Sequence, residues 1–288
     1  MALFTVLVMG FLWSLFDLIR KKSLKYFNEY EILLVVITSQ LALFSYSLVF
    51  SDLIVNNIEY FFYYLPLVAM GLIAFYSFLK ALKSSEISLV IPMLSFTPLF
   101  SSIYAYSILE EKMSLANYIG IIVVIVGSLI LYSKSLSIRN LFFSPLVLIR
   151  NANARLMLLV SLIWSLTPVL DKKCLSYTDI YFHGFLQSAG WIVAFPLILM
   201  KSKVSIKKMF EKKTGYLIFS IALIGSAVSI IQLFALTINL VPVLESFKRS
   251  IGIILAIAFG YFFFKEKVNF KKILSVIVMV VGLNLLLD

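Results

Sequence analysis

Three charged side chains lie close together in an otherwise apolar stretch (VPVLESFKRSIG, residues 241–252). Glu245 precedes Lys248 by three residues and Arg249 by four, so a helix would carry all three on one face. A charge inside a membrane helix costs about 2.5–3.5 kcal/mol on insertion scales, so each one needs a reason. Two interpretations stay open: a self-neutralising cluster near one end of a helix, or cations in a central cavity that receive a carboxylate or phosphate.

Asp17 is a further charge within an apolar run, and it follows Trp13 by one helical turn. Its carboxylate could couple solute movement to a proton, or it could form an ion pair with Arg20 or Lys21 near the end of the helix. Glu245 is the alternative proton carrier. If transport is coupled to protons, we expect one of these two carboxylates to carry them.

Trp13 and Trp164 lie near the middle of their apolar runs, whereas tryptophans that anchor helices lie at the membrane boundary. We expect this pair to form apolar walls of a central cavity with capacity for cation–π contacts, or else simply to pack. Amides in hydrocarbon need hydrogen-bonding partners and should face the bundle interior. The residues expected to bind solute are Trp13, Asp17, Gln40, Trp164, Gln187, Trp191, Gln232, Glu245, Lys248 and Arg249.

Enzymatic and metal chemistry find little support in the composition. The single histidine, His183, rules out a His-rich centre and is expected at the membrane interface, while the single cysteine, Cys174, rules out an intramolecular disulfide. No Walker A sequence is present, so the chain should not hydrolyse ATP itself. We expect no cofactor, no metal and no enzymatic activity. An intramembrane lipid-modifying enzyme is the less favoured alternative.

The composition is that of an integral membrane protein. Hydrophobic residues make up 62% of the chain, against about 45–50% in soluble domains. The net charge of +11 would suit nucleic acid in a soluble protein, but here loop lysines and arginines fix orientation in the bilayer. We therefore expect membrane lipids and a small-molecule solute as partners, no nucleic acid, and a bacterial inner (plasma) membrane as the location.

Ten apolar stretches are candidates to cross a hydrocarbon core of about 30 Å as helices. They are residues 2–19, 31–50, 61–82, 86–109, 115–133, 155–172, 180–200, 215–237, 240–264 and 269–287. Charged or polar joints separate them. The odd-numbered joints hold 20 of the Lys and Arg residues and the even-numbered ones hold 3, which places both termini outside by the positive-inside rule.

The chain contains two copies of one pattern. GFLWSLFDLIRKKSLKY (10–26) matches SLIWSLTPVLDKKCLSY (161–177), and a second match pairs residues 108–131 with 263–286. We predict a first repeat at residues 1–135, a linker at 136–152 and a second repeat at 153–288. Because each repeat has an odd number of helices, the second must insert upside down. The predicted fold is thus an all-α polytopic membrane protein with ten transmembrane helices as two inverted five-helix repeats.

Matches between the copies indicate a shared scaffold, and mismatches indicate the site. Asp17 has Pro168 as its counterpart, and the Glu245–Lys248–Arg249 face has an uncharged stretch as its counterpart. An asymmetric solute requires such asymmetry.

Proline and glycine indicate which helices bend or pack closely. Pro92, Pro98 and Gly252 are the expected gating residues, with a static kink as the alternative. Small residues allow close helix contact, either within the bundle or between protomers, so the sequence leaves monomer and homodimer open. These small residues are Gly120, Gly127 and Gly282.

The close of each copy is similar to the end of an EamA domain, a family within the drug/metabolite transporter superfamily. The similar segments are EEKMSLANYIGIIVVIVGSLIL (110–131) and KEKVNFKKILSVIVMVVGLNLL (265–286). Where that family usually has a glycine before the corner glutamate, this chain has Glu110 and Lys265. The resemblance implies two five-helix domains with cytoplasmic termini, opposite to the charge count.

We therefore predict a secondary transporter that moves a small organic metabolite by alternating access. The expected solute is an amino acid or another anion-bearing compound. A lipid-linked flippase of the same fold is the alternative.

Overall fold

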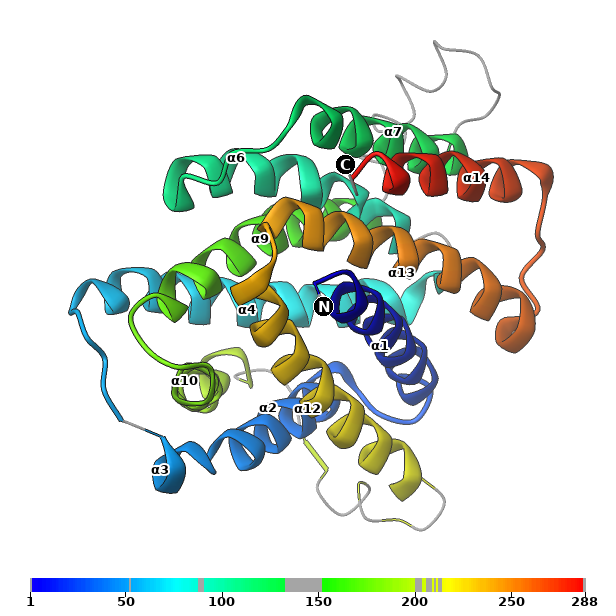
Figure 1. Cartoon of the computed structure of the whole chain (residues 1–288). Helices are drawn as coiled ribbons and strands as arrows, with labels where there is room; N and C mark the ends of the chain where they lie inside the picture. The colour runs from blue at the N-terminus through cyan, green and yellow to red at the C-terminus, as the bar shows by residue number, and fades with distance from the viewer. Residues whose placement is uncertain are drawn as a thin grey trace.

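A computed structural model describes residues 2–51, 53–87, 91–132, 152–199, 204–205, 209, 211 and 214–286. Within these residues, the chain is a bundle of ten α-helices of 13 to 26 residues, with one shorter α-helix and one 3-10 segment (Figure 1). The predicted linker, residues 136–152, lies outside the described residues except for Ala152.

The helices before the predicted linker are α1 (Ala2–Ser23), α2 (Glu29–Phe44), α3 (Ser47–Phe50), α4 (Glu59–Ser84), η1 (Ile91–Phe96), α6 (Thr97–Leu109) and α7 (Leu115–Tyr132). Those after it are α9 (Ala152–Leu175), α10 (Ile180–Leu199), α12 (Gly215–Ile238), α13 (Val241–Phe264) and α14 (Phe270–Asn284). Among the described residues, six helices are long and apolar enough to cross a membrane. The architecture is therefore that of a polytopic, all-helical membrane protein.

One predicted stretch, residues 86–109, is not a single α-helix. The structure has the 3-10 segment η1 at Ile91–Phe96, with Pro92 in it, followed by α6 with Pro98 in its first turn. Proline cannot donate a backbone hydrogen bond and clashes with the preceding turn, so it is tolerated at the start of a helix and not in its interior. The two prolines thus split this stretch into two pieces.

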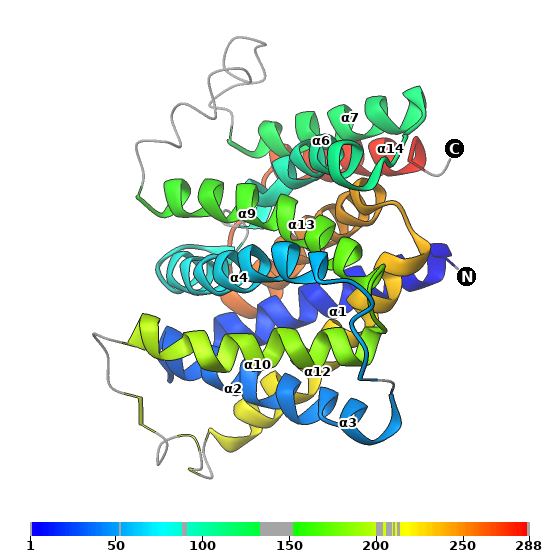
Figure 2. The ribbon, with the colours of Figure 1, turned by 90° about the vertical axis from the view of Figure 1, so that its left-hand side faces the viewer.

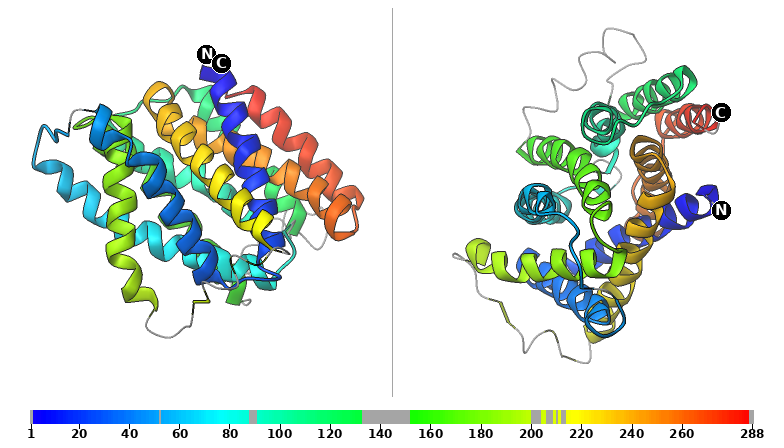
Figure 3. Two further views of the ribbon diagram at one scale, coloured as in Figure 1. Left: turned by 90° about the horizontal axis from the view of Figure 1, so that it is seen from below. Right: turned by 60° about the vertical axis from the view of Figure 1, so that its left-hand side comes forward.

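Contacts between helices follow the repeat. α1 packs on α12 and α13, and its counterpart α9 packs in the same way on α4 and α6. The equivalent helices α7 and α14 pack on each other at one edge of the molecule, and α2 and α10 do so toward the opposite edge (Figure 2). α2 and α10 lie side by side in both views of Figure 3.

The lysine that recurs near the end of the first helix of each copy makes an equivalent hydrogen bond in both copies. Lys21 Nζ donates to the carbonyl oxygen of Leu82 in the last turn of α4 at 2.6 Å, and Lys172 Nζ donates to that of Asn239 at the end of α12 at 2.7 Å. Unpaired carbonyls at a helix end favour such cations. Glu111 links this contact to α13, because its carboxylate accepts hydrogen bonds from both Lys172 Nζ and the Val241 amide.

Two non-glycine residues adopt left-handed backbone conformations at the ends of α6 and α13. Glu110 has φ 57° and Lys265 has φ 56°, and these are the positions where the family usually has glycine. Each cap amide bonds a carbonyl of the preceding turn, that of Ala105 or Gly260. Glu110 and Lys265 therefore form the left-handed helix cap that glycine commonly forms.

Candidate binding cavity

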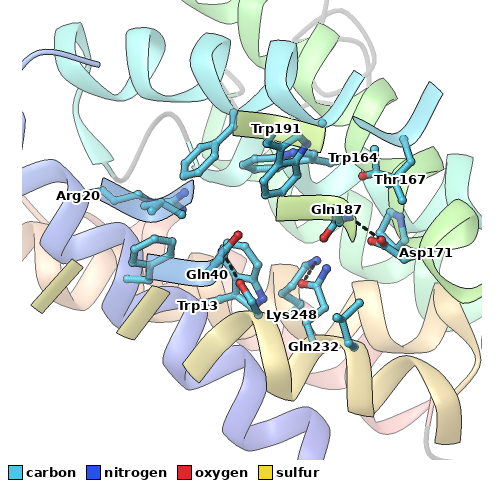
Figure 4. A pocket seen from close by; sticks show the side chains of 18 of the residues that line it. Trp13, Arg20, Gln40, Trp164, Thr167, Asp171, Gln187, Trp191, Gln232 and Lys248 are labelled. Atoms are coloured by element: carbon cyan, nitrogen blue, oxygen red, sulfur yellow. Dashed lines mark hydrogen bonds between the residues drawn. The ribbon is translucent and has the colours of Figure 1, made fainter. Parts of the chain in front are cut away.

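A cavity of about 810 Å³, a volume that includes its mouth, lies among α1, α2, α4, α9, α10, α12 and α13. Helices from both copies line it, so it lies where the two halves of the chain meet (Figure 4).

Eight of the ten residues that we expected to bind solute line this cavity. They are Trp13, Gln40, Trp164, Gln187, Trp191, Gln232, Lys248 and Arg249. The other two, Asp17 and Glu245, are not among the lining residues. Each forms ion pairs with cations that do line the cavity.

The Glu245–Lys248–Arg249 cluster combines both of its sequence interpretations. Glu245 is fully buried, and its carboxylate pairs with Lys248 Nζ and, at 3.0 Å, with Arg249 Nη2. Both cations nevertheless line the cavity, and Lys248 Nζ also reaches Gln232 Oε1 at 3.4 Å. The cluster is therefore buried inside the helix bundle. Its two cations and one carboxylate leave one excess positive charge at the cavity.

Tryptophan rings cover these cations. Lys248 Nζ lies 5.3 Å from the centroid of the Trp13 ring, and Arg249 Cζ lies 5.3 Å from that of Trp164. Both separations fall within the reach of cation–π attraction. The matched tryptophans of the two copies thus hold the two adjacent cations of α13.

Arg20 is a lining residue that the sequence reasoning considered only as a partner of Asp17. Its guanidinium pairs with Asp17 and lies 4.2 Å from the ring centroid of Phe16 and 4.5 Å from that of Phe78. Asp17 is therefore an ion-pair partner, which was one of its two expected roles. The signal for Arg20 was present, because it occupies the same position in the first copy as Asp171 in the second.

Asp171 and His183 form a second polar group at the cavity. His183 is fully buried among side chains in the first turn of α10, and its expected position at the membrane interface stays a prediction. Its ring is satisfied inside the bundle, because Nε2 lies 3.1 Å from Asp171 Oδ1 and Nδ1 lies 2.9 Å from Tyr60 Oη. Gln187 Nε2 also donates to Asp171 Oδ1 at 2.7 Å. Figure 4 shows Arg20 at one end of the labelled side chains and Asp171 at the other.

Several buried donors at the cavity have no hydrogen-bond partner within the described protein. They are Trp13 Nε1, Arg20 Nε and Nη1, and Arg249 Nε. Other lining groups are paired: Gln40 donates to Ser229 Oγ, and Trp191 Nε1 donates to the Val68 carbonyl at 3.1 Å. A buried donor without a partner is costly, and these four atoms are enclosed by the surrounding side chains.

The predicted gating residues lie on neighbouring elements. η1 and α6, which carry Pro92 and Pro98, both pack against α13. A Cβ added at Gly252 would lie 3.7 Å from Ile91 Cγ2, an ordinary contact distance. The elements thus meet as expected, and gating itself stays a prediction.

Comparison with protein families decides the class of this chain. The model of the EamA-like transporter family matches residues 1–133 and 154–287. The chain belongs to the EamA-like transporter family. This family is part of the drug/metabolite transporter superfamily, and its members are transporters, which favours transport over catalysis. The chain is accordingly an integral membrane protein of a transporter family.

Comparison with individual proteins adds the fold. No curated protein matches the chain. A solved structure described only as "Crystal structure of protein" is 11% identical, covers 97% of this chain and 95% of its own, and has a TM-score of 0.67. At that identity, the similarity supports the fold alone.

Proposed function

We propose that this EamA-like protein is a secondary transporter that moves a small, carboxylate-bearing organic solute, such as an amino acid, by alternating access. Ten transmembrane helices form two inverted five-helix repeats, and the cavity between them is the solute site. The observation that carries the proposal is the cavity itself, where Arg20, Lys248 and Arg249 line the same space as three tryptophans.

The arrangement of the helices supports an inverted repeat. The joint after α6 lies at the left of Figure 1, while the equivalent joint after α13 lies at the right. α1 begins and α14 ends at the same side of the molecule, as an even number of crossings requires (Figure 2). Transporters built from inverted repeats bind solute near the middle of the membrane between the repeats and open to each side in turn.

The chemistry of the cavity supports a solute with a carboxylate. Arginine and lysine donate charge-assisted hydrogen bonds to such groups, and arginine can do so with two parallel bonds. Arg20, Lys248 and Arg249, which line the cavity, would supply these bonds. The aromatic walls would then contact the apolar part of the solute.

The same cavity disfavours a lipid-linked flippase. A flippase needs an apolar path open to the bilayer, whereas this cavity has three glutamines, three cations and one carboxylate among its lining groups. We therefore place a water-soluble solute first and the flippase second.

The test is a screen of amino acids and short mono- and dicarboxylates by thermal shift on the purified protein, followed by flux measurement in proteoliposomes. We expect at least one carboxylate to stabilise the protein and to show saturable flux. Lys112→Gln, an exposed lysine in the joint after α6, serves as a control that should behave as wild type. Saturable flux of an uncharged or cationic solute, with no response to carboxylates, would contradict the proposal.

A further inference from the structure

The Asp171–His183 pair is a buried titratable site at the wall of the cavity. Asp171 lines the cavity, and His183 lies behind it on α10. The hydrogen bonds continue from His183 Nδ1 to the hydroxyl of Tyr60, in the first turn of α4. A continuous set of hydrogen-bonded groups therefore links the cavity to one end of the bundle.

The geometry accommodates two protonation states. With a neutral ring, His183 Nε2–H donates to ionised Asp171, and Nδ1 accepts from the Tyr60 hydroxyl. Adding one proton at Nδ1 makes an imidazolium, whose Nδ1–H then donates to Tyr60 Oη. An imidazole can carry one or two protons, and both forms fit the two hydrogen bonds of His183.

The carboxylates that the sequence favoured as proton carriers are held differently. Asp17 pairs with Arg20, and Glu245 pairs with Lys248 and Arg249. Arginine stays protonated, so neutralising either carboxylate would leave an arginine charge uncompensated in the bundle interior. Asp171 has only a histidine and an amide as polar partners within the described residues, and its pair can lose or gain charge.

Charge links this pair to the solute site. The three cations at the cavity, Arg20, Lys248 and Arg249, are balanced by Asp17, Glu245 and Asp171 when His183 is neutral. One proton on the pair gives the site a net positive charge, which favours an anionic solute. By thermodynamic linkage, bound solute raises the proton affinity of the pair by the same factor by which the proton raises the solute affinity.

We propose that Asp171 and His183 are the proton-binding site that couples proton movement to solute movement in the same direction. The inference rests on the proposed transport function. The titratable groups that interact with Asp171 are Tyr60 on α4, Cys174 on its own helix α9 and Lys248 on α13, and Tyr64 stacks on Tyr60.

The nearby Tyr177 is a poor alternative carrier. It lies in the joint between α9 and α10, and its hydroxyl donates to Glu59 Oε2 at 2.9 Å. Partial desolvation and this carboxylate raise the pKa of Tyr177 to about 12, so it keeps its proton at physiological pH.

The first test needs no solute. Because the chain has one histidine, histidine-selective isotope labelling gives an NMR signal from His183 alone, provided that the purification tag carries none. We expect this signal to change with pH as the ring gains a proton. The midpoint should move in Asp171→Asn, and it should stay in Asp179→Asn, which keeps an N-cap residue before α10. A signal that ignores pH, or ignores Asp171→Asn, would overturn the inference.

The second test measures coupling in proteoliposomes with radiolabelled amino acids and short carboxylates as probes. For each protein, the rate of solute accumulation with an acidic exterior is divided by the rate of solute exchange with equal pH on both sides. This ratio should exceed one in wild type and in Lys112→Gln, and it should fall to one in Asp171→Asn and His183→Gln. Exchange without a response to the pH gradient, or an unchanged ratio in both variants, would refute coupling while transport stands. Absence of exchange in wild type would refute the transport proposal instead, and the NMR titration would still decide the proton site.

Discussion

Arg20 and Asp171 occupy the same position in the two copies and carry opposite charges. Both line the cavity, and Figure 4 shows them at its opposite ends. A two-fold scaffold would otherwise offer an asymmetric solute two equal orientations. The exchange of arginine for aspartate, together with the cations Lys248 and Arg249 on α13, gives the cavity a positive side and a negative end.

Every tryptophan of the chain lines the cavity, so its intrinsic fluorescence should report solute binding. The three are Trp13, Trp164 and Trp191, and the sequence has no others. We expect a carboxylate that binds between them to change the emission in a saturable way. Trp164→Phe should weaken binding by about 0.5–2 kcal/mol, because it weakens the cation–π contact that holds Arg249. Emission that stays constant while the solute stabilises the protein would place the binding site elsewhere.

Sequence reasoning found eight of the lining residues but not Arg20 and Asp171 as site members. Tryptophan, glutamine and paired cations inside apolar runs carry a clear signal, because each is costly in hydrocarbon unless it has a partner. Arg20 and Asp171 directly precede the repeated lysine pairs, where the apolar runs end. α1 and α9 continue to Ser23 and Leu175, so these two side chains lie within helices and face the bundle.

At the scale of elements, the two helix ends with left-handed residues offer a stability test. A non-glycine residue in this conformation costs roughly 1–2 kcal/mol, and glycine avoids that cost. We expect Glu110→Gly and Lys265→Gly each to stabilise the protein by about 0.5–1 kcal/mol, read as a higher melting temperature in detergent. Lys112→Gly lies in the same joint without a positive φ, so it should not stabilise. A lower melting temperature for both cap variants would contradict the assigned conformation.

The packing of α7 against α14 offers a second test. A Cβ added at Gly120 would lie 2.8 Å from the Gly282 carbonyl oxygen, so the two backbones touch there. Gly120→Ala should therefore destabilise the protein by about 1–3 kcal/mol. Gly215→Ala is the control, since nothing lies within 4 Å of an added Cβ at that position. Equal melting temperatures for the two variants would exclude this close contact.

This contact answers a question that the glycine pattern left open. Gly120, Gly127 and Gly282 could have packed within the bundle or between protomers, and the structure shows them within it. Sequence pattern predicts that a small residue meets a neighbour, but the identity of the neighbour depends on how distant helices come together. The ten helix positions, by contrast, followed from apolar length alone, except that residues 31–50 form both α2 and α3 and that Pro92 and Pro98 divide residues 86–109.

At the scale of the whole molecule, the inverted repeat predicts the sidedness of two equivalent joints. In a Cys174→Ser background, Lys112→Cys and Lys267→Cys should react with an impermeant thiol reagent from opposite sides of the membrane. The native Cys174 is buried and cannot serve as this probe. Loop charges place Lys112 outside, whereas cytoplasmic termini would place it inside. Reaction of both positions from the same side would refute the inverted repeat.

The most direct test of the central claim is carboxylate transport by Lys248→Gln in proteoliposomes, beside wild type and Lys112→Gln. Arg249 keeps its ion pair with Glu245 in this variant, so the helix should remain folded. A charge-assisted hydrogen bond is worth about 1.5–3 kcal/mol, which predicts a KM raised roughly 10- to 100-fold. Lys112→Gln should transport as wild type does. Wild-type KM for a carboxylate in folded Lys248→Gln would contradict the account.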